Sequence, residues 1–283
     1  MPRTHVAALT LLAMLAFAGN SLLCRAALKS TAIDPASFTW IRIASGALAL
    51  WLIVRWRGRL RQRPAGNWVS AFALFSYAAA FSFSYLTLSA GTGALLLFGA
   101  VQVTMIGVGY WKGERLGVQQ TVGLLCAFLG LVWLLWPGLA APPLHGSLLM
   151  LLAGLAWGVY SLRGRGSGDP LDATAGNFAR ALALAAILGL LLLPAASLDR
   201  AGVALAMASG ALASGVGYAI WYTALAGLKV SSAAIVQLSV PVIAAIGGVV
   251  LLGEPLTPRI VAASFAILGG IALVTAGRRQ ASS

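Results

Sequence analysis

Ten long apolar runs follow one another along the chain, and each has about the length of a membrane-crossing helix. A helix needs ~20 apolar residues to cross the ~30 Å hydrocarbon core of a bilayer. The runs cover residues 4–24, 36–55, 67–88, 92–111, 118–136, 145–163, 173–193, 202–226, 231–252 and 257–276. The segments between them are too short to hold a soluble domain. We therefore predict an all-α, polytopic membrane protein with a single membrane domain over residues 1–283.

The composition agrees with a chain whose solvent is mostly lipid. Hydrophobic residues make up 60% and charged residues 9% of the sequence, whereas soluble domains carry roughly a quarter charged residues. The net charge of +13 could suggest a nucleic-acid partner. The basic residues lie in short loops between apolar runs, however, where membrane orientation explains them. We expect the lipid bilayer as a partner, and no nucleic acid.

Lysine and arginine are distributed unequally over the two sides of the predicted bundle. If the N-terminus is cytoplasmic, the inside loops and ends hold thirteen basic residues and the outside loops four, with Arg42 and Arg180 inside spans. Cytoplasmic loops carry the excess of positive charge. We therefore predict a bacterial inner-membrane protein with both termini in the cytoplasm. Ala16-Phe17-Ala18 resembles a signal-peptide cleavage site, but the run continues apolar to Cys24, so we expect this first helix to be retained.

A weak internal repeat divides the chain into two halves. Residues 91–134 align without gaps to residues 231–274, and Gly113-Glu114 then meets Gly253-Glu254. Chance similarity between apolar helices is the alternative explanation, but the spacing, the order and the Gly-Glu pair agree. We place repeat one at about 1–138 and repeat two at about 145–277. Each repeat has five spans, an odd number, so the second must enter the membrane from the opposite side. Inverted repeats of this kind are typical of transporters that alternate access to a central site.

With these features the chain resembles the drug/metabolite transporter superfamily, specifically its EamA-type ten-helix exporters. The resemblance rests on a Gly-Glu pair after the fourth helix of each half and on a segment from proline to arginine that opens the second helix. Pro35 to Arg42 fits that segment well, and Pro170 to Arg180 fits it loosely. The resemblance implies two inverted five-helix repeats around a central cavity and the export of amino acids or related metabolites. With an aromatic lining of that cavity, the chain resembles the aromatic amino-acid exporters of this superfamily.

Polar and aromatic residues inside the spans are the candidates for substrate binding. Polar groups within a membrane are costly and usually face the interior of a bundle. Tyr77 and Phe81 lie one helical turn apart on one face, and under the repeat Phe81 corresponds to Trp221. Helix packing is the alternative role for the aromatic residues, and helix–helix hydrogen bonding for the amides. The predicted substrate-binding residues are Asn20, Tyr77, Phe81, Gln102, Trp157, Asn177, Tyr218, Trp221, Gln237 and Ser239.

Arg42, Arg180 and Pro241 each leave alternatives open. Both arginines lie several residues inside a span. They could extend to the lipid headgroups, pair structurally, or contact a substrate carboxylate. Pro241 lies inside the ninth run and predicts a kink, which could expose backbone groups near Gln237 to a cavity or could simply be fixed.

Several kinds of chemistry have no basis in the sequence. None of the six acidic residues lies near the middle of a span, and no phosphate-binding loop, metal-ligand cluster or nucleophile–base pair is present. We therefore expect no cofactor, no metal, no enzymatic activity and no obligate protein partner. We predict a secondary transporter of small molecules that acts as a facilitator, because proton coupling normally requires a titratable group in the membrane. The alternative is export of hydrophobic drugs or cations by proton antiport.

Overall fold

The computed structural model describes residues 3–58, 65–111, 113, 117–138, 141–164, 169–228, 233 and 236–280. Within these ranges the regular structure is helical and no strand occurs. The helices, with η1 a short 3₁₀ turn and η2 a π-helical segment, are α1 (Arg3–Ser30), α2 (Pro35–Trp56), α3 (Trp68–Ser84), α4 (Ala90–Trp111), α5 (Val118–Leu135), α6 (Leu144–Gly164), α7 (Pro170–Leu191), η1 (Leu193–Ala195), α8 (Arg200–Met207), η2 (Ala208–Val216), α9 (Gly217–Leu225), α11 (Ser239–Leu252) and α12 (Pro258–Gln280).

The predicted all-α membrane fold is confirmed. Among the described residues, eight helices are long and apolar enough to cross a bilayer, and α8, η2 and α9 together form one of them. The shorter apolar helices α3 and α11 complete a set of ten. Tryptophans near helix ends lie on the outer surface, as an interfacial position requires. They are Trp56, Trp68, Trp111, Trp133 and Trp136.

Polar residues between the apolar runs determine where several helices begin. The Asp34 side chain caps α2 by accepting hydrogen bonds from the backbone N–H groups of Ala36 and Ser37, each at 2.9 Å. Pro35 occupies the first turn of that helix, where its missing N–H costs nothing. Asn67, Asp169 and Asp199 cap α3, α7 and α8 in the same way. Each cap satisfies backbone donors that would otherwise lack a partner at the helix end.

The glycine of each Gly-Glu pair has a positive φ angle. Gly253 ends α11 with φ +62°, and Gly113 has φ +92° after α4. Glycine adopts this left-handed conformation without the steric penalty that other residues incur. The turn at Gly253 brings the Glu254 N–H within 3.0 Å of the Gly248 carbonyl and directs the chain back toward the bundle. The corresponding Glu114 lies outside the described residues.

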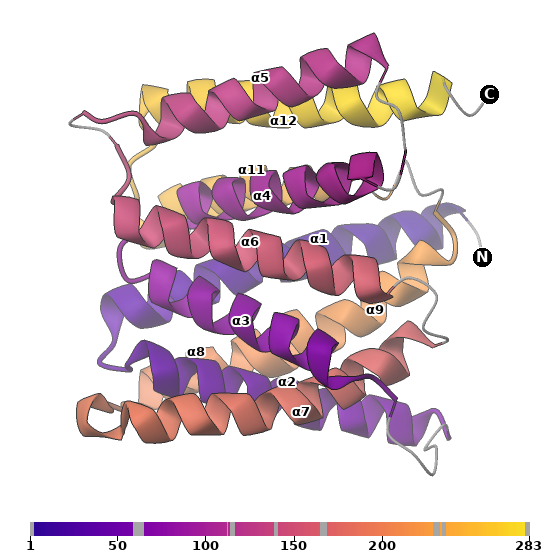
Figure 1. The fold of residues 1–283 in the computed structure, drawn as a ribbon. Helices are drawn as coiled ribbons and strands as arrows, with labels where there is room; N and C mark the ends of the chain where they lie inside the picture. The colour runs from indigo at the N-terminus through magenta and orange to yellow at the C-terminus, as the bar shows by residue number, and fades with distance from the viewer. Residues whose placement is uncertain are drawn as a thin grey trace.

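The two halves pack in a pseudo-symmetric arrangement. Counterparts pair across the middle of the molecule, α2 with α7, α4 with α11 and α5 with α12, and α3 packs on α6 as α9 packs on α1. Figure 1 shows the α5–α12 pair at one edge, α2 and α7 toward the other, and α1, α3, α4, α6 and α9 between them. The N- and C-termini lie on the same side of the bundle. The fold is thus a ten-helix bundle of two inverted five-helix repeats.

The π-helical segment η2 lies in the middle of its span and packs against α2. A β-carbon on Gly210 would meet the Arg42 carbonyl oxygen and the Ser45 hydroxyl, so only glycine permits this close approach. π-Helical turns are rare and are often found at functional sites. Here the segment places Ser209, which is fully buried, against α1.

Candidate functional site

A cavity of about 840 Å³ lies between the two halves of the bundle. It is lined by residues of α1, α3, α4, α6, α7, η2, α9 and α12, together with Leu228, Ala233 and Gln237 and the turn before α3. On the side of the termini its lining reaches Asn67, Arg163 and Leu228 at helix ends. On the opposite side it stops at Ser21, Phe81 and Leu97. The cavity therefore extends toward one side of the membrane only.

Nine of the ten residues predicted to bind substrate line this cavity. They come from both halves and are Asn20, Tyr77, Phe81, Gln102, Trp157, Asn177, Tyr218, Trp221 and Gln237. Ser239 does not line it, and its hydroxyl donates a 2.7 Å hydrogen bond to the Val236 carbonyl. The helix is interrupted at Leu238, between Gln237 and Ser239, so Pro241 lies in the first turn of α11. Whether these residues bind a substrate remains a prediction.

Trp157 is the centre of an aromatic wall. Its ring stacks on Tyr160 at 5.3 Å and on Tyr218 at 5.5 Å, and it lies 4.8 Å from Tyr77 between ring centroids. Phe17 extends the wall by contacting Tyr218 at 5.8 Å. Such clusters offer large, rigid faces for a planar ligand, with hydroxyl groups at their edges.

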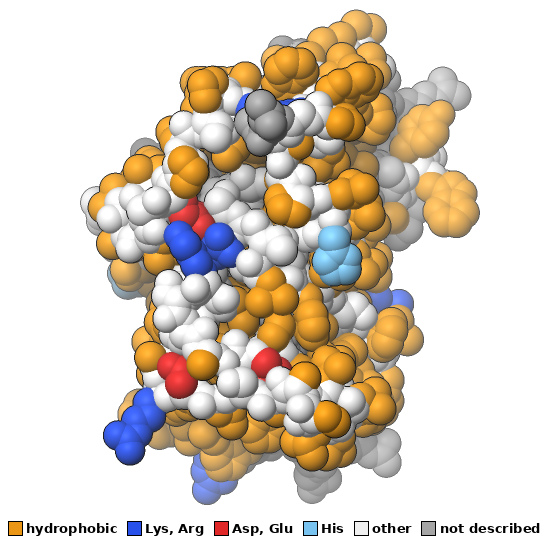
Figure 2. Space-filling view, turned by 90° about the vertical axis from the view of Figure 1, so that its left-hand side faces the viewer, with side chains coloured by type: hydrophobic (Ala, Val, Ile, Leu, Met, Phe, Trp, Pro, Cys, Tyr) orange, Lys and Arg blue, Asp and Glu red, His pale blue; other side chains and the backbone are white. Residues whose placement is uncertain are grey.

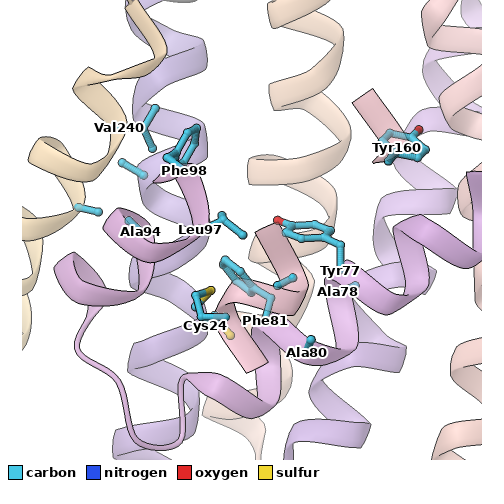
Figure 3. Close-up of a cluster of buried hydrophobic side chains, with 14 of the residues drawn as sticks. Cys24, Tyr77, Ala78, Ala80, Phe81, Ala94, Leu97, Phe98, Tyr160 and Val240 are labelled. Carbon is cyan, nitrogen blue, oxygen red and sulfur yellow. The ribbon is translucent and has the colours of Figure 1, made fainter. Parts of the chain in front are cut away.

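Figure 3 shows how α3 and α4 contribute to the wall. Tyr77 and Phe81 project from neighbouring turns of α3 toward Leu97 and Phe98 of α4. The rings of Tyr77 and Phe81 lie 5.4 Å apart and tilted. This one-turn spacing is the pattern that identified the two residues in the sequence, and it keeps both rings on the same face of the helix.

A polar cluster lies at the inner end of the cavity. The Asn20 amide donates to the Tyr77 hydroxyl at 3.2 Å, and its carbonyl oxygen accepts from the Ser209 hydroxyl at 2.6 Å. Arg42 Nη2 donates to the same Tyr77 oxygen at 2.9 Å. Arg42 is only 2% exposed, so it does not extend to the headgroups as one interpretation of the sequence allowed.

A second polar cluster lies nearer the mouth. The Tyr160 hydroxyl donates to Thr174 Oγ1 at 3.2 Å, and the Tyr222 hydroxyl lies 3.0 Å from the same atom. Sequence reasoning did not single out Phe17, Tyr160 or Thr174. Each lies three residues from a predicted site residue, Asn20, Trp157 and Asn177 respectively. Neighbours at this spacing share a helix face, so extending each face by one turn would have found them.

An ion pair lies at the end of the bundle opposite the termini (Figure 2). Arg25 of α1 forms an ion pair with Glu254 at 2.8 Å and donates to the carbonyl oxygens of Tyr85 and Leu86. The other Glu254 oxygen accepts from the Ala90 N–H at 2.8 Å, at the start of α4. The carboxylate therefore joins α1 and α4 to the turn after α11, and Arg25 links the same cluster to the residues that follow α3. Figure 2 shows this end of the molecule, where a few charged side chains lie among hydrophobic ones.

Comparisons with known proteins identify relatives over nearly the whole chain. The EamA-like transporter family matches residues 5–136 and again residues 144–276. An uncharacterized protein of Pseudomonas aeruginosa is 61% identical over 98% of this chain and 97% of its own length. An uncharacterized transporter of Archaeoglobus fulgidus is 26% identical over 83% of this chain and 86% of its own length. A solved crystal structure shares the fold with a TM-score of 0.69 and 20% identity, covering 97% of this chain and 98% of the other.

Proposed function

The chain belongs to the EamA-like transporter family, and we propose that it is a secondary transporter that exports small metabolites, most of all amino acids, aromatic ones included. The aromatic-lined cavity of about 840 Å³ between the two halves carries this proposal. Pockets of ~300–1,000 Å³ enclose small organic ligands. A molecule with one aromatic ring would fit against the stacked rings of Trp157 and Tyr218.

The mechanism we propose is alternating access. The cavity extends toward the termini, and the Arg25–Glu254 pair lies beyond its other end. With both termini in the cytoplasm of a bacterial cell, this is the conformation that receives substrate from inside. Rocking of the two inverted halves would then close the mouth and open the opposite end. Fusions of a cytoplasm-active and a periplasm-active reporter to the C-terminus test the orientation, and periplasmic activity would contradict it.

Counterflow in proteoliposomes tests the transport function. Vesicles are preloaded with an unlabelled amino acid, and the same amino acid carrying a label is added outside. We expect saturable uptake of the label, because a carrier exchanges the two pools without net transport. The variants Phe81→Ala, Trp157→Ala and Gln237→Ala are expected to alter rate or selectivity, because these side chains line the cavity. If folded variants transport every compound of the panel as the wild type does, the cavity is not the substrate site. Uptake of hydrophobic cations instead of amino acids would favour the drug-exporter alternative.

A further inference from the structure

Arg42 is a cation buried behind the cavity wall, and none of the acidic residues that the structure describes forms an ion pair with it. We infer that Arg42, acting through the Tyr77 hydroxyl, makes the Asn20–Tyr77 end of the cavity a subsite for a carboxylate. The transporter would accordingly select aromatic carboxylates over aromatic amines of the same shape. The inference rests on the proposed function only in taking this cavity as the place where substrate binds.

The guanidinium of Arg42 has a nitrogen that makes no hydrogen bond to any residue that the structure describes. Nη2 donates to Tyr77, while Nη1 is buried with no hydrogen-bond partner. Two aromatic rings also lie close to the guanidinium, whose carbon is 4.7 Å from the centre of Phe81 and 5.3 Å from that of Tyr77. Arginine keeps its charge at any accessible pH. A buried, uncompensated charge is costly, and such residues within membranes usually mark a substrate or ion path.

The acidic residues that the structure describes lie away from Arg42. Asp34, Asp169 and Asp199 cap helix starts, Asp172 lies in the first turn of α7, and Glu254 pairs with Arg25. None of these five lines the cavity. The charge next to the aromatic wall is therefore positive, and no described carboxylate is placed to receive a substrate ammonium group.

The Tyr77 hydroxyl connects Arg42 to the cavity surface through a hydrogen bond. Its oxygen accepts two hydrogen bonds, one from Arg42 and one from Asn20. Ser209 fixes the Asn20 amide in the donating orientation, because its hydroxyl donates to the Asn20 oxygen at 2.6 Å. The single phenolic proton is left for a third partner, and no described residue accepts it. Tyr77 and Asn20 both line the cavity, so an acceptor within the cavity would complete the set. A carboxylate oxygen is the strongest such acceptor.

Arg180, the counterpart of Arg42 in the second half, has a different environment. Its Nη1 donates to the carbonyl oxygens of Ala65 and Gly176, each at 2.8 Å. It does not line the cavity. Arg180 therefore holds backbone near the start of α3, whereas Arg42 faces a hydroxyl and two rings. The pair supplies a matched control, because removing either arginine removes one positive charge from within a membrane-spanning helix.

Binding of three compounds that share a phenyl ring and a short chain tests the subsite. We would titrate 3-phenylpropionate, phenylalanine and 2-phenylethylamine into the purified full-length protein in detergent and follow binding calorimetrically. The wild type is expected to bind the two carboxylates about tenfold or more tightly than the amine, as a charge-assisted hydrogen bond provides. Arg42→Gln and Tyr77→Phe should both reduce that ratio to near one. Arg42→Lys should retain part of it, and Arg180→Gln should leave it unchanged.

The ratio separates a substrate role from a structural one. If Arg42 only holds helices together, Arg42→Gln lowers stability and weakens all three compounds equally, which overturns the inference. Equal affinity of the wild type for acid and amine overturns it as well. Neither result affects the counterflow test, which does not depend on the sign of the ligand charge. If Arg42→Gln does not fold, Tyr77→Phe alone decides, because it keeps the ring and removes only the hydroxyl.

Discussion

The Arg25 guanidinium lies 2.8 Å from the Glu254 carboxylate, and this contact ties α1 of the first half to the turn after α11 of the second. Both side chains are largely shielded, with exposed fractions of 13% and 5%. The glutamate belongs to the Gly-Glu pair that revealed the internal repeat. Its position at the closed end of the cavity gives that sequence feature a physical role, because breaking the contact should change access to the interior.

Loss of the ion pair should expose Cys24. Cys24 is fully buried one residue before Arg25. Glu254→Gln keeps an acceptor for the Ala90 N–H but removes the charge, and breaking a buried pair costs roughly 3–5 kcal/mol. In a Cys126→Ser background, a membrane-impermeant maleimide applied to intact cells should label Cys24 faster in Glu254→Gln than in the parent. Equal labelling would show that the pair does not control this end.

Position 210 should not tolerate a residue with a β-carbon in place of Gly210, whereas position 189 should tolerate one in place of Gly189. A β-carbon at Gly210 would meet the Arg42 carbonyl, which is backbone and cannot move aside cheaply, but at Gly189 it would meet nothing within 4 Å. We expect Gly210→Ala to destabilise the protein by about 1–3 kcal/mol. Gly189→Ala, also within a helix, should be neutral or stabilising by up to ~1 kcal/mol. Thermal unfolding of both variants in detergent measures the difference, and equal melting temperatures would contradict the packing of η2 on α2.

Asp34 should make stability depend on pH at the acidic end. Partial burial raises its pKa, but hydrogen bonds from Ser37, Ser197 and Ala36 outweigh this and lower it below the ordinary value. The stability that the carboxylate contributes is thus complete above the unfolded-state pKa of about 3.9, and it is lost as the pH falls through the lower folded-state value.

Asp34→Asn keeps a good helix cap while removing the titration. The wild type should therefore melt higher than this variant at neutral pH, and the two curves should converge below about pH 3. Melting temperatures measured across this range test the expectation. A constant difference between the two proteins at every pH would show that the charge of Asp34 is not responsible.

Trp157→Ala should weaken binding of an aromatic ligand, whereas Trp133→Ala should not. Trp157 contacts three cavity tyrosines, while Trp133 is 58% exposed on the outer surface. Loss of one stacking partner is worth ~0.5–1.5 kcal/mol beyond burial, so affinity should fall about threefold to tenfold. Trp157→Phe should recover part of the loss. Calorimetric titration of the three variants measures it, and equal loss in both alanine variants would indicate a general effect on folding.

The outline of the fold could be predicted from the sequence, and nine of the ten residues proposed to bind substrate line the cavity, for a specific reason. Span length and charge bias follow from the bilayer, and the one-turn spacing of Tyr77 and Phe81 places both on one face wherever the helix packs. The position of Arg42 could not be predicted. Its side chain packs on Tyr77 and Phe81 of α3, a contact between helices that the local sequence does not indicate. Ser239 is a polar residue within a predicted span, but it does not line the cavity, and the helix is interrupted between it and Gln237.

Transport should not respond to an imposed pH gradient. The described cavity lining contains no aspartate, glutamate or histidine, and proton coupling normally requires a titratable group within the membrane. One proton that moves down a gradient of one pH unit releases about 1.4 kcal/mol of free energy. If substrate movement is coupled to that proton, this is enough for roughly tenfold accumulation of substrate. We therefore expect proteoliposomes held at a fixed membrane potential with potassium and valinomycin to reach the same final substrate level with and without the gradient. The fixed potential matters because a carboxylate substrate that carries net charge would respond to voltage as well. Accumulation of about tenfold that a protonophore abolishes would identify a proton antiporter and contradict facilitated export.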